Sequence, residues 1–166
     1  RLAPSTATRA ISLGSANGRK FTFACGIGVD AEIVRAVDAR GRKGGKRPGD
    51  HVFAWELTKL LVRNGFRLRP RMEIVGHGRC AFAVTANGDP YTFAGRIPVR
   101  ATPLGRFDAG LDILAPRRLG LVGMAGLAYA ALIRPGRQTR SSTYIYLSDA
   151  DDVTIRCDQP TALQVD

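Results

Sequence analysis

Short apolar runs near the N-terminus predict a β-hairpin. Residues 10–13 and 21–25 are β-prone, and Asn17-Gly18 lies between them. An Asn-Gly pair is typical of tight hairpin turns, because both residues accept the positive φ values that such turns require. The first part of the chain is therefore expected to fold as two short strands around this turn.

Apolar residues at helical spacing follow the hairpin and predict two helices. The first covers residues 31–40, and we expect the carboxylate of Asp30 to cap its first backbone N–H groups. A basic, glycine-rich loop over residues 40–49 leads to the second helix, which covers 50–64 and ends at Gly65.

Beyond residue 66 the pattern changes to short β-prone runs separated by Gly, Asn, Asp and Pro. The one long apolar run, residues 119–133, predicts a helix ended by Pro135-Gly136. Strands are expected at 67–75, 79–86, 92–100, 110–115, 143–147, 153–157 and 162–165. Many close-spaced strands with few helices predict a mainly β (α+β) fold, an antiparallel sandwich or barrel. Residues 1–166 show no internal boundary and are expected to form a single domain.

Composition supports a folded chain in a reducing compartment. Of 166 residues, 45% are apolar and 23% charged, which excludes wholesale disorder. Three cysteines without a CxxC pair argue against a disulfide framework and a zinc site, and favour the cytoplasm. The longest apolar run is shorter than the ~20 residues of a membrane-spanning helix. The chain starts at Arg1 without a leader or initiator Met, so we expect it to be a piece of a longer protein.

The net charge of +11 favours polyanionic partners such as nucleic acid, an anionic membrane or nucleotide phosphates. A surplus of solvated arginine is the plainer alternative. Residues 35–71 hold 11 Lys and Arg against 3 Asp and Glu, and this segment is the candidate membrane-facing surface.

Standard catalytic motifs are absent from the sequence: it has no GxSxG, HExxH or GxxxxGK[ST]. Gly26-Ile27-Gly28, between a strand and a helix, is compatible either with a phosphate cradle or with close backbone packing. Cys25 and Cys80 lie in apolar strands and are expected to be buried, unreactive thiols.

Two groups of acidic residues are candidates for cation binding or for turns. Asp108 and Asp112 flank a glycine, and a second group lies at 149–152. Asp166 follows a short strand, where its carboxylate is either a general base or an arbitrary terminal acid. The residues alone leave these alternatives open.

Four segments in order resemble one family. Residues 23–31 (FACGIGVDA) are similar to a GxGFDA signature, and residues 86–98, with Asn87-Gly88 and Ile97-Pro98, to an NG…YGG…P strand pair. Residues 107–113 (FDAGLDI) are similar to DDGLLDV, and residues 159–166 to the run leading into DGE. Together they resemble the C-terminal domain of the diacylglycerol kinase catalytic family, which includes bacterial lipid kinases and the sphingosine and ceramide kinases.

The resemblance implies a β-sandwich like domain 2 of bacterial lipid kinases, and an ATP-dependent kinase acting on the hydroxyl of diacylglycerol or a related lipid. It implies that an N-terminal domain, absent from this chain, holds ATP on a GGDGT loop, so that the piece alone is inactive. A structural Mg²⁺ would be bound by the Asp108 carboxylate and the carbonyls of Gly105 and Gly110, and Asp166 would be the catalytic base. The expected partners are that kinase domain, the lipid substrate, an anionic membrane surface in peripheral contact, and a second copy in a homodimer. Residues 119–133 would either line an acyl-chain pocket or belong to the core.

The alternative function is a non-catalytic basic β-domain that binds nucleic acid, which the lipid-kinase interpretation excludes as a partner. Base stacking needs aromatic residues interleaved with basic ones. The 12 aromatic residues lie mostly in apolar contexts, and Tyr144 and Tyr146 are the one candidate pair. An enzyme resembling NAD kinase is a third, weaker alternative.

Overall fold

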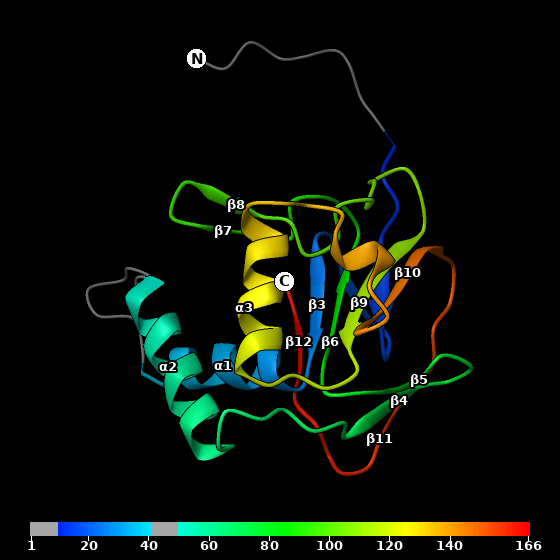
Figure 1. Cartoon of the computed structure of the whole chain (residues 1–166). Helices are drawn as coiled ribbons and strands as arrows, with labels where there is room; N and C mark the ends of the chain where they lie inside the picture. Colours follow the sequence, from blue (N-terminus) through cyan, green and yellow to red (C-terminus); the bar gives the residue numbers. More distant parts are fainter. Residues whose placement is uncertain (1–9, 41–49) are drawn as a thin grey trace.

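The computed structural model describes residues 10–40 and 50–166, and over these residues the chain is mainly β with three α-helices (Figure 1). The helices are α1 (Val29–Asp38), α2 (Asp50–Arg63) and α3 (Leu121–Leu132), with a 3₁₀ turn at Gln138–Arg140. The strands are β1 (Gly14–Ala16), β2 (Arg19–Phe21), β3 (Ala24–Ile27), β4 (Met72–Ile74), β5 (Gly78–Cys80), β6 (Ala83–Ala86), β7 (Thr92–Ala94), β8 (Ile97–Val99), β9 (Leu111–Pro116), β10 (Tyr144–Ala150), β11 (Ile155–Cys157) and β12 (Leu163–Val165). All strand pairs are antiparallel, so the predicted α+β class with antiparallel sheets is confirmed.

A five-stranded sheet in the order β10-β9-β6-β3-β12 forms the centre of the molecule. One of its faces carries Ala83, Ile113 and Ile145, which form one buried cluster with Met72 and Ile74 of the three-stranded sheet β11-β4-β5. The two sheets therefore share a hydrophobic core, whereas the likeness to the lipid-kinase sandwich stays a prediction.

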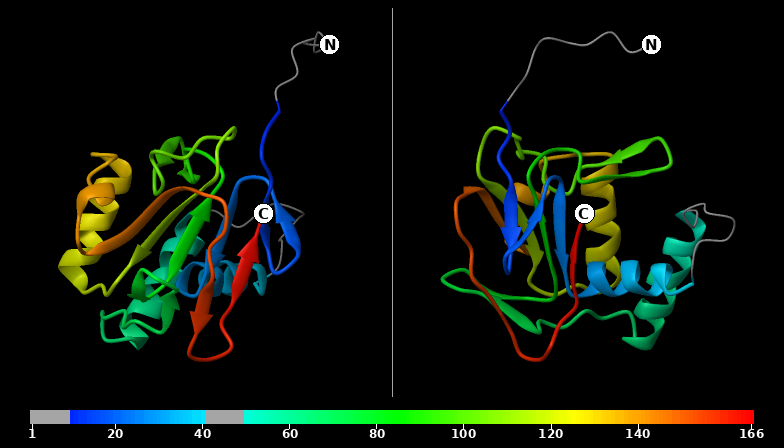
Figure 2. Two further views of the ribbon diagram at one scale, coloured as in Figure 1. Left: turned by 90° about the vertical axis from the view of Figure 1, so that its right-hand side faces the viewer. Right: turned by 180° about the vertical axis from the view of Figure 1, so that it is seen from behind.

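The opposite face of the central sheet is covered in part by α3. Val84 and Leu114 point to this side and pack against Leu127 of the helix. Alternation along each strand thus sends neighbouring residues into two different cores. Figure 2 shows α3 at one side of the molecule and the β1–β2 hairpin at the opposite side.

The predicted N-terminal hairpin is present, with its turn at Asn17 (φ 50°) and Gly18 (φ 80°). Its strands are shorter and shifted: β1 begins at Gly14, and residues 24–27 leave the hairpin to pair within the central sheet. The predicted strand 21–25 thus spans the end of β2 and the start of β3. Periodicity does not reveal this division, because the residues on both sides of it are apolar.

Five of the predicted strands are shorter or divided, and residues 153–157 and 162–165 lose only one or two residues, as β11 and β12. Residues 67–75 contribute only β4, and residues 79–86 cross from β5 in the small sheet to β6 in the central sheet. The predicted strand 92–100 is a hairpin, β7–β8, because Gly95 at φ 61° turns the chain. Gly95 marks this turn in the sequence, whereas the change of sheet between β5 and β6 leaves no mark on the pattern.

The helices lie close to their predicted positions, and Gly65 at φ 58° ends α2 as expected. The predicted capping role of Asp30 is wrong: Gly28 is the N-cap of α1, and no side chain caps the helix. Asp30 lies one residue inside the helix instead. Most of the predicted basic loop, residues 41–49, lies outside the described residues. Within the described part of the chain, no helix is long and apolar enough to cross a membrane.

Candidate functional site

Antiparallel pairing brings four distant segments to one end of the central sheet. The register pairs Ala24 with Ala86, Ala86 with Asp112, and Val165 with Cys25. The start of β3, the end of β6, the start of β9 and the end of β12 therefore meet at the same edge. These are parts of the four segments on which the sequence resemblance depends.

Asp166 lies at this end of the sheet with its carboxylate exposed and held by backbone N–H groups. Phe23 donates to Oδ2 at 2.9 Å, and Thr22 and Ala24 donate to Oδ1 at 3.2 and 3.3 Å. A carboxylate has about four acceptor sites, so these donors fix its orientation without exhausting its capacity. Its predicted role as a base is untested by this geometry, and Asp166 does not line the cavities of about 740 and 380 Å³ found among the described residues.

Asn87 connects the backbone below Asp166 to the N-terminal segment. Its side chain is fully buried, and its Nδ2 donates to the carbonyls of Ser12 at 2.5 Å and Thr22 at 3.1 Å. Its backbone N–H donates to the Phe23 carbonyl at 2.8 Å. A single asparagine thus holds two of the residues whose amides bind the Asp166 carboxylate.

Ser12 extends this network to the loop before β9. Its Oγ contacts Asn87 Oδ1 at 3.0 Å and the carbonyls of Phe107 at 3.1 Å and Ala109 at 2.7 Å, and its N–H donates to Phe107 O at 2.8 Å. The rings of Phe23 and Phe107 meet edge to face at 5.7 Å. A Cβ at Gly88 would lie 2.7 Å from the Phe107 ring, so only glycine permits this packing.

The predicted magnesium ligands Gly105, Asp108 and Gly110 lie in this same loop. Asp108 Oδ1 accepts a bond from Arg106 Nε at 3.1 Å, and the N–H of Gly110 donates to Asp149 Oδ1 at 2.7 Å. Among the described residues, no three His, Cys, Asp or Glu side chains form a metal-binding group. The predicted set needs one carboxylate and two carbonyls, an all-oxygen set that suits Mg²⁺. Because the Arg106 side chain is exposed, its ion pair with Asp108 is a weak competitor.

Asp112 is a buried carboxylate that the sequence marked only as part of an acidic group. It accepts bonds from the Tyr146 hydroxyl at 2.5 Å, the Ser148 hydroxyl at 2.9 Å and the Asp149 N–H at 3.2 Å. Burial and the bond to Asp112 raise the pKa of Tyr146, so its hydroxyl remains a donor. This network fixes the start of β9 against β10.

A second pair, the half-buried Asp30 and Tyr91, was not predicted. The Tyr91 hydroxyl donates to Asp30 Oδ2 at 2.7 Å, and burial raises the pKa of both groups. The carboxylate folds over Gly26, where an added Cβ would lie 1.9 Å from Oδ2. Because this places a carboxylate above the Gly26-Ile27-Gly28 turn, the geometry favours close packing over a phosphate cradle.

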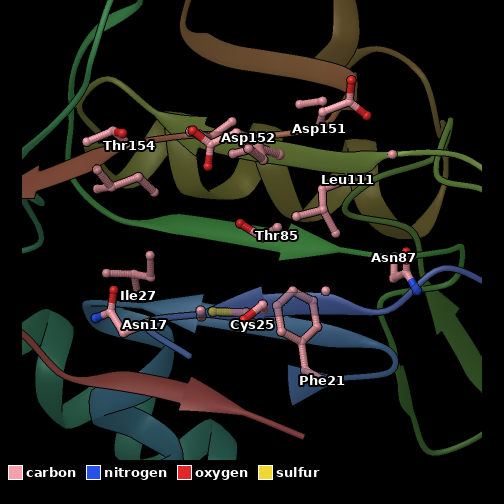
Figure 3. Close-up of a pocket in the computed structure, with 18 of the residues that line it drawn as sticks. Asn17, Phe21, Cys25, Ile27, Thr85, Asn87, Leu111, Asp151, Asp152 and Thr154 are labelled. Atoms are coloured by element: carbon pink, nitrogen blue, oxygen red, sulfur yellow. The ribbon is translucent and has the colours of Figure 1, made fainter. Parts of the chain in front are cut away.

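A cavity of about 740 Å³ opens on the face of the central sheet opposite α3 (Figure 3). It lies between β3, β6 and β9 and the segments 12–17 and 150–157. Its apolar lining includes Phe21, Ile27, Ile113, Ile155 and Leu163. Asn87, Ala109 and Gly110 also line it, so the cavity reaches the network described above. Its volume lies within the roughly 300–1,000 Å³ of ordinary ligand sites.

Residues 119–133 belong in part to the core and in part to the surface. Leu119, Ala130 and Ala131 are buried, as the core alternative predicted, whereas most of α3 is exposed. The helix does not line this cavity. Cys25 and Cys80 are buried as predicted, and burial raises the pKa of each thiol to about 11. Cys25 lines the cavity as an un-ionised group.

Comparison with protein-family models and with curated proteins finds no match to this chain. Asp166, Asn87 and the 105–110 loop meet at one edge. The Asp30–Tyr91 and Asp112–Tyr146 pairs were missed, because partners 61 and 34 residues apart leave no local signal.

Proposed function

We propose that this chain is the lipid-holding C-terminal domain of an ATP-dependent lipid kinase that phosphorylates the hydroxyl of diacylglycerol or a related lipid. The observation that carries the proposal is the meeting of Asp166, Asn87 and the 105–110 loop at one sheet edge. The cavity begins at the same network, at Asn87 and Gly110, and its lining combines apolar side chains with polar ones, among them Asp151 and Asp152. An acyl chain in this cavity would leave its polar end near the edge.

Asp166 would take the proton from the lipid hydroxyl as the new O–P bond forms. Phosphoryl transfer passes through a loose transition state, so the protein mainly positions groups and neutralises charge. A positioned general base contributes roughly 10²–10⁴-fold. The amides of Thr22, Phe23 and Ala24 hold the carboxylate in one orientation, and its exposure leaves it open to a substrate.

Mg²⁺, when bound, would fix the loop through the Asp108 carboxylate and the carbonyls of Gly105 and Gly110. This residue set fits the ion in donor chemistry, and Asp149 adds a second carboxylate against Gly110. ATP would be held by a separate nucleotide-binding domain. The proposal includes peripheral contact with an anionic membrane from the cytoplasm.

The nucleic-acid alternative depends on Tyr144 and Tyr146 as a stacking pair. Both rings pack against the core beside α3, and the Tyr146 hydroxyl is bonded to buried Asp112. Side chains held in this way do not offer free faces to a base. The observation favours the lipid-kinase proposal over this alternative.

The deciding experiment measures lipid phosphorylation by the chain joined to its nucleotide-binding domain. Asp166→Asn keeps the shape of the side chain but removes the base, and we expect kcat to fall at least ~100-fold. Asp38→Asn, at the exposed end of α1, is the matched control and should retain full activity. Near-normal turnover by Asp166→Asn would remove this residue from the mechanism, and no lipid phosphorylation by the wild type would end the kinase proposal.

A further inference from the structure

Helix α3 is unusual in carrying no charged side chain although half of it faces outward. Its sequence is LVGMAGLAYAAL. Leu121 and Val122 are 59% and 87% exposed, and Tyr129, Leu132 and the following Ile133 are also exposed. Scattered apolar residues on a surface are normal, but a contiguous apolar patch marks an interaction site.

The exposed positions of α3 do form one contiguous face. With about 100° between successive residues, the exposed residues fall within an arc of about 160°. The exposed residues are Leu121, Val122, Ala125, Gly126, Ala128, Tyr129, Leu132 and Ile133. Met124, Leu127, Ala130 and Ala131 lie on the other side and pack inward or are buried. The helix thus has an inner apolar half and an equally apolar outer half.

Arginine flanks this face at both ends. Arg117 and Arg118 precede α3, Arg134, Arg137 and Arg140 follow it, and all five are exposed. Residues 113–148 contain no Asp or Glu. Within residues 113–148, the charged side chains near the apolar face are therefore all cationic.

We propose that the outer face of α3 docks on an anionic lipid bilayer, with the helix lying flat in the interface. A helix of 12 residues is about 18 Å long, too short to span the bilayer but long enough to bury one apolar face among the headgroups. The flanking arginines then meet lipid phosphates, and Tyr129 lies at headgroup depth. This inference goes beyond the proposed kinase function, because membrane contact requires no phosphoryl transfer.

Charge decides against a second copy of the chain as the occupant. In a two-fold symmetric pair the same patch contacts itself, so five arginines of one copy would surround the same face as five of the other. Like charges at an interface are costly, whereas an anionic leaflet neutralises all five. The surface also differs from segment 35–71, on which the sequence alone had placed the membrane contact.

The test measures flotation of the full chain with vesicles of phosphatidylcholine containing one quarter phosphatidylglycerol. Val122→Glu places a charge on the most exposed apolar position, where it does not disturb the core, and we expect at least about 10-fold weaker binding. Ile11→Glu, at an exposed apolar residue before the β1–β2 hairpin on the opposite side of the molecule (Figure 2), is the matched control and should bind as the wild type does. Replacing Arg134 or Arg137 by Gln should weaken binding about fivefold each, and Arg156→Gln should not.

Each outcome supports or overturns the proposal. Wild-type binding that falls with salt, is absent on pure phosphatidylcholine and is lost in Val122→Glu supports it. No wild-type binding to anionic vesicles overturns it, as does equal binding by Val122→Glu. If the wild type sediments as a dimer that Val122→Glu dissociates, and vesicles are not bound, a second copy covers the face instead. A lack of kinase activity would not change the interpretation of these outcomes, because the vesicle assay contains neither ATP nor substrate.

Discussion

Replacing Asn87 by Ala tests the network that joins the sheet edge. The substitution removes two donations, to the carbonyls of Ser12 and Thr22, and the contact of Oδ1 with the Ser12 hydroxyl. A buried hydrogen bond contributes about 1 kcal/mol net, so three contacts give a loss of about 3 kcal/mol. For a chain of 166 residues, this lowers Tm by about 6–12 °C.

Denaturant unfolding of matched variants measures the effect. Asn64→Ala removes a single bond, from Nδ2 to the Leu60 carbonyl at 2.7 Å, and should cost only about 1 kcal/mol. Asn87→Asp should be worse than Asn87→Ala at neutral pH, because a carboxylate oxygen then faces two carbonyl oxygens in a buried site. Acid should recover part of that loss by protonating the new carboxyl group.

A double-mutant cycle with Ser12→Ala isolates the contact between the two side chains, and we expect a coupling of about 1 kcal/mol. If Asn87→Ala costs no more than Asn64→Ala, Asn87 does not connect the segments and the network does not position Asp166. The reasoning from hydrogen-bond geometry would then be wrong.

Two further predictions concern the half-buried carboxyl group of Asp30 and the metal. Burial raises the pKa of Asp30 above its ordinary value of 3.8, so its contribution to stability is fully present below that value and is lost as pH rises through the folded-state pKa, by at most about 1.4 kcal/mol per pH unit. Asp30→Asn should remove this loss, so the Tm of the variant relative to the wild type should rise from pH 4 to pH 8, and a constant difference would contradict the assignment. Mg²⁺ at about 100 times its Kd should raise the wild-type Tm by about 5–10 °C, and Asp108→Ala should abolish this rise while Asp38→Ala retains it. A wild-type Tm that does not respond to Mg²⁺ would exclude the proposed metal site.

Much of the candidate site could be anticipated as segments but not as contacts. The sequence placed Asn87, the 105–110 loop and Asp166 in three separate motifs, and the register of β3, β6, β9 and β12 makes them neighbours. The role of Asp30 could not be inferred, because its choice between capping α1 and bonding Tyr91 depends on a residue 61 positions away. The hydrogen bond to Tyr91 replaces the capping interaction that the local sequence favours.

The sequence by itself determined the local features: the Asn17-Gly18 turn, the extents of α2 and α3, the end of α2 at Gly65 and the antiparallel, mainly β class. Each of these follows from periodicity or from the backbone freedom of one or two residues. Only the tertiary structure decided which strands share a sheet, where the cavity opens and which half of α3 is left uncovered. The physical reason is that α3 is apolar on every side, so its sequence does not indicate which face packs on the sheet and which is left to a partner.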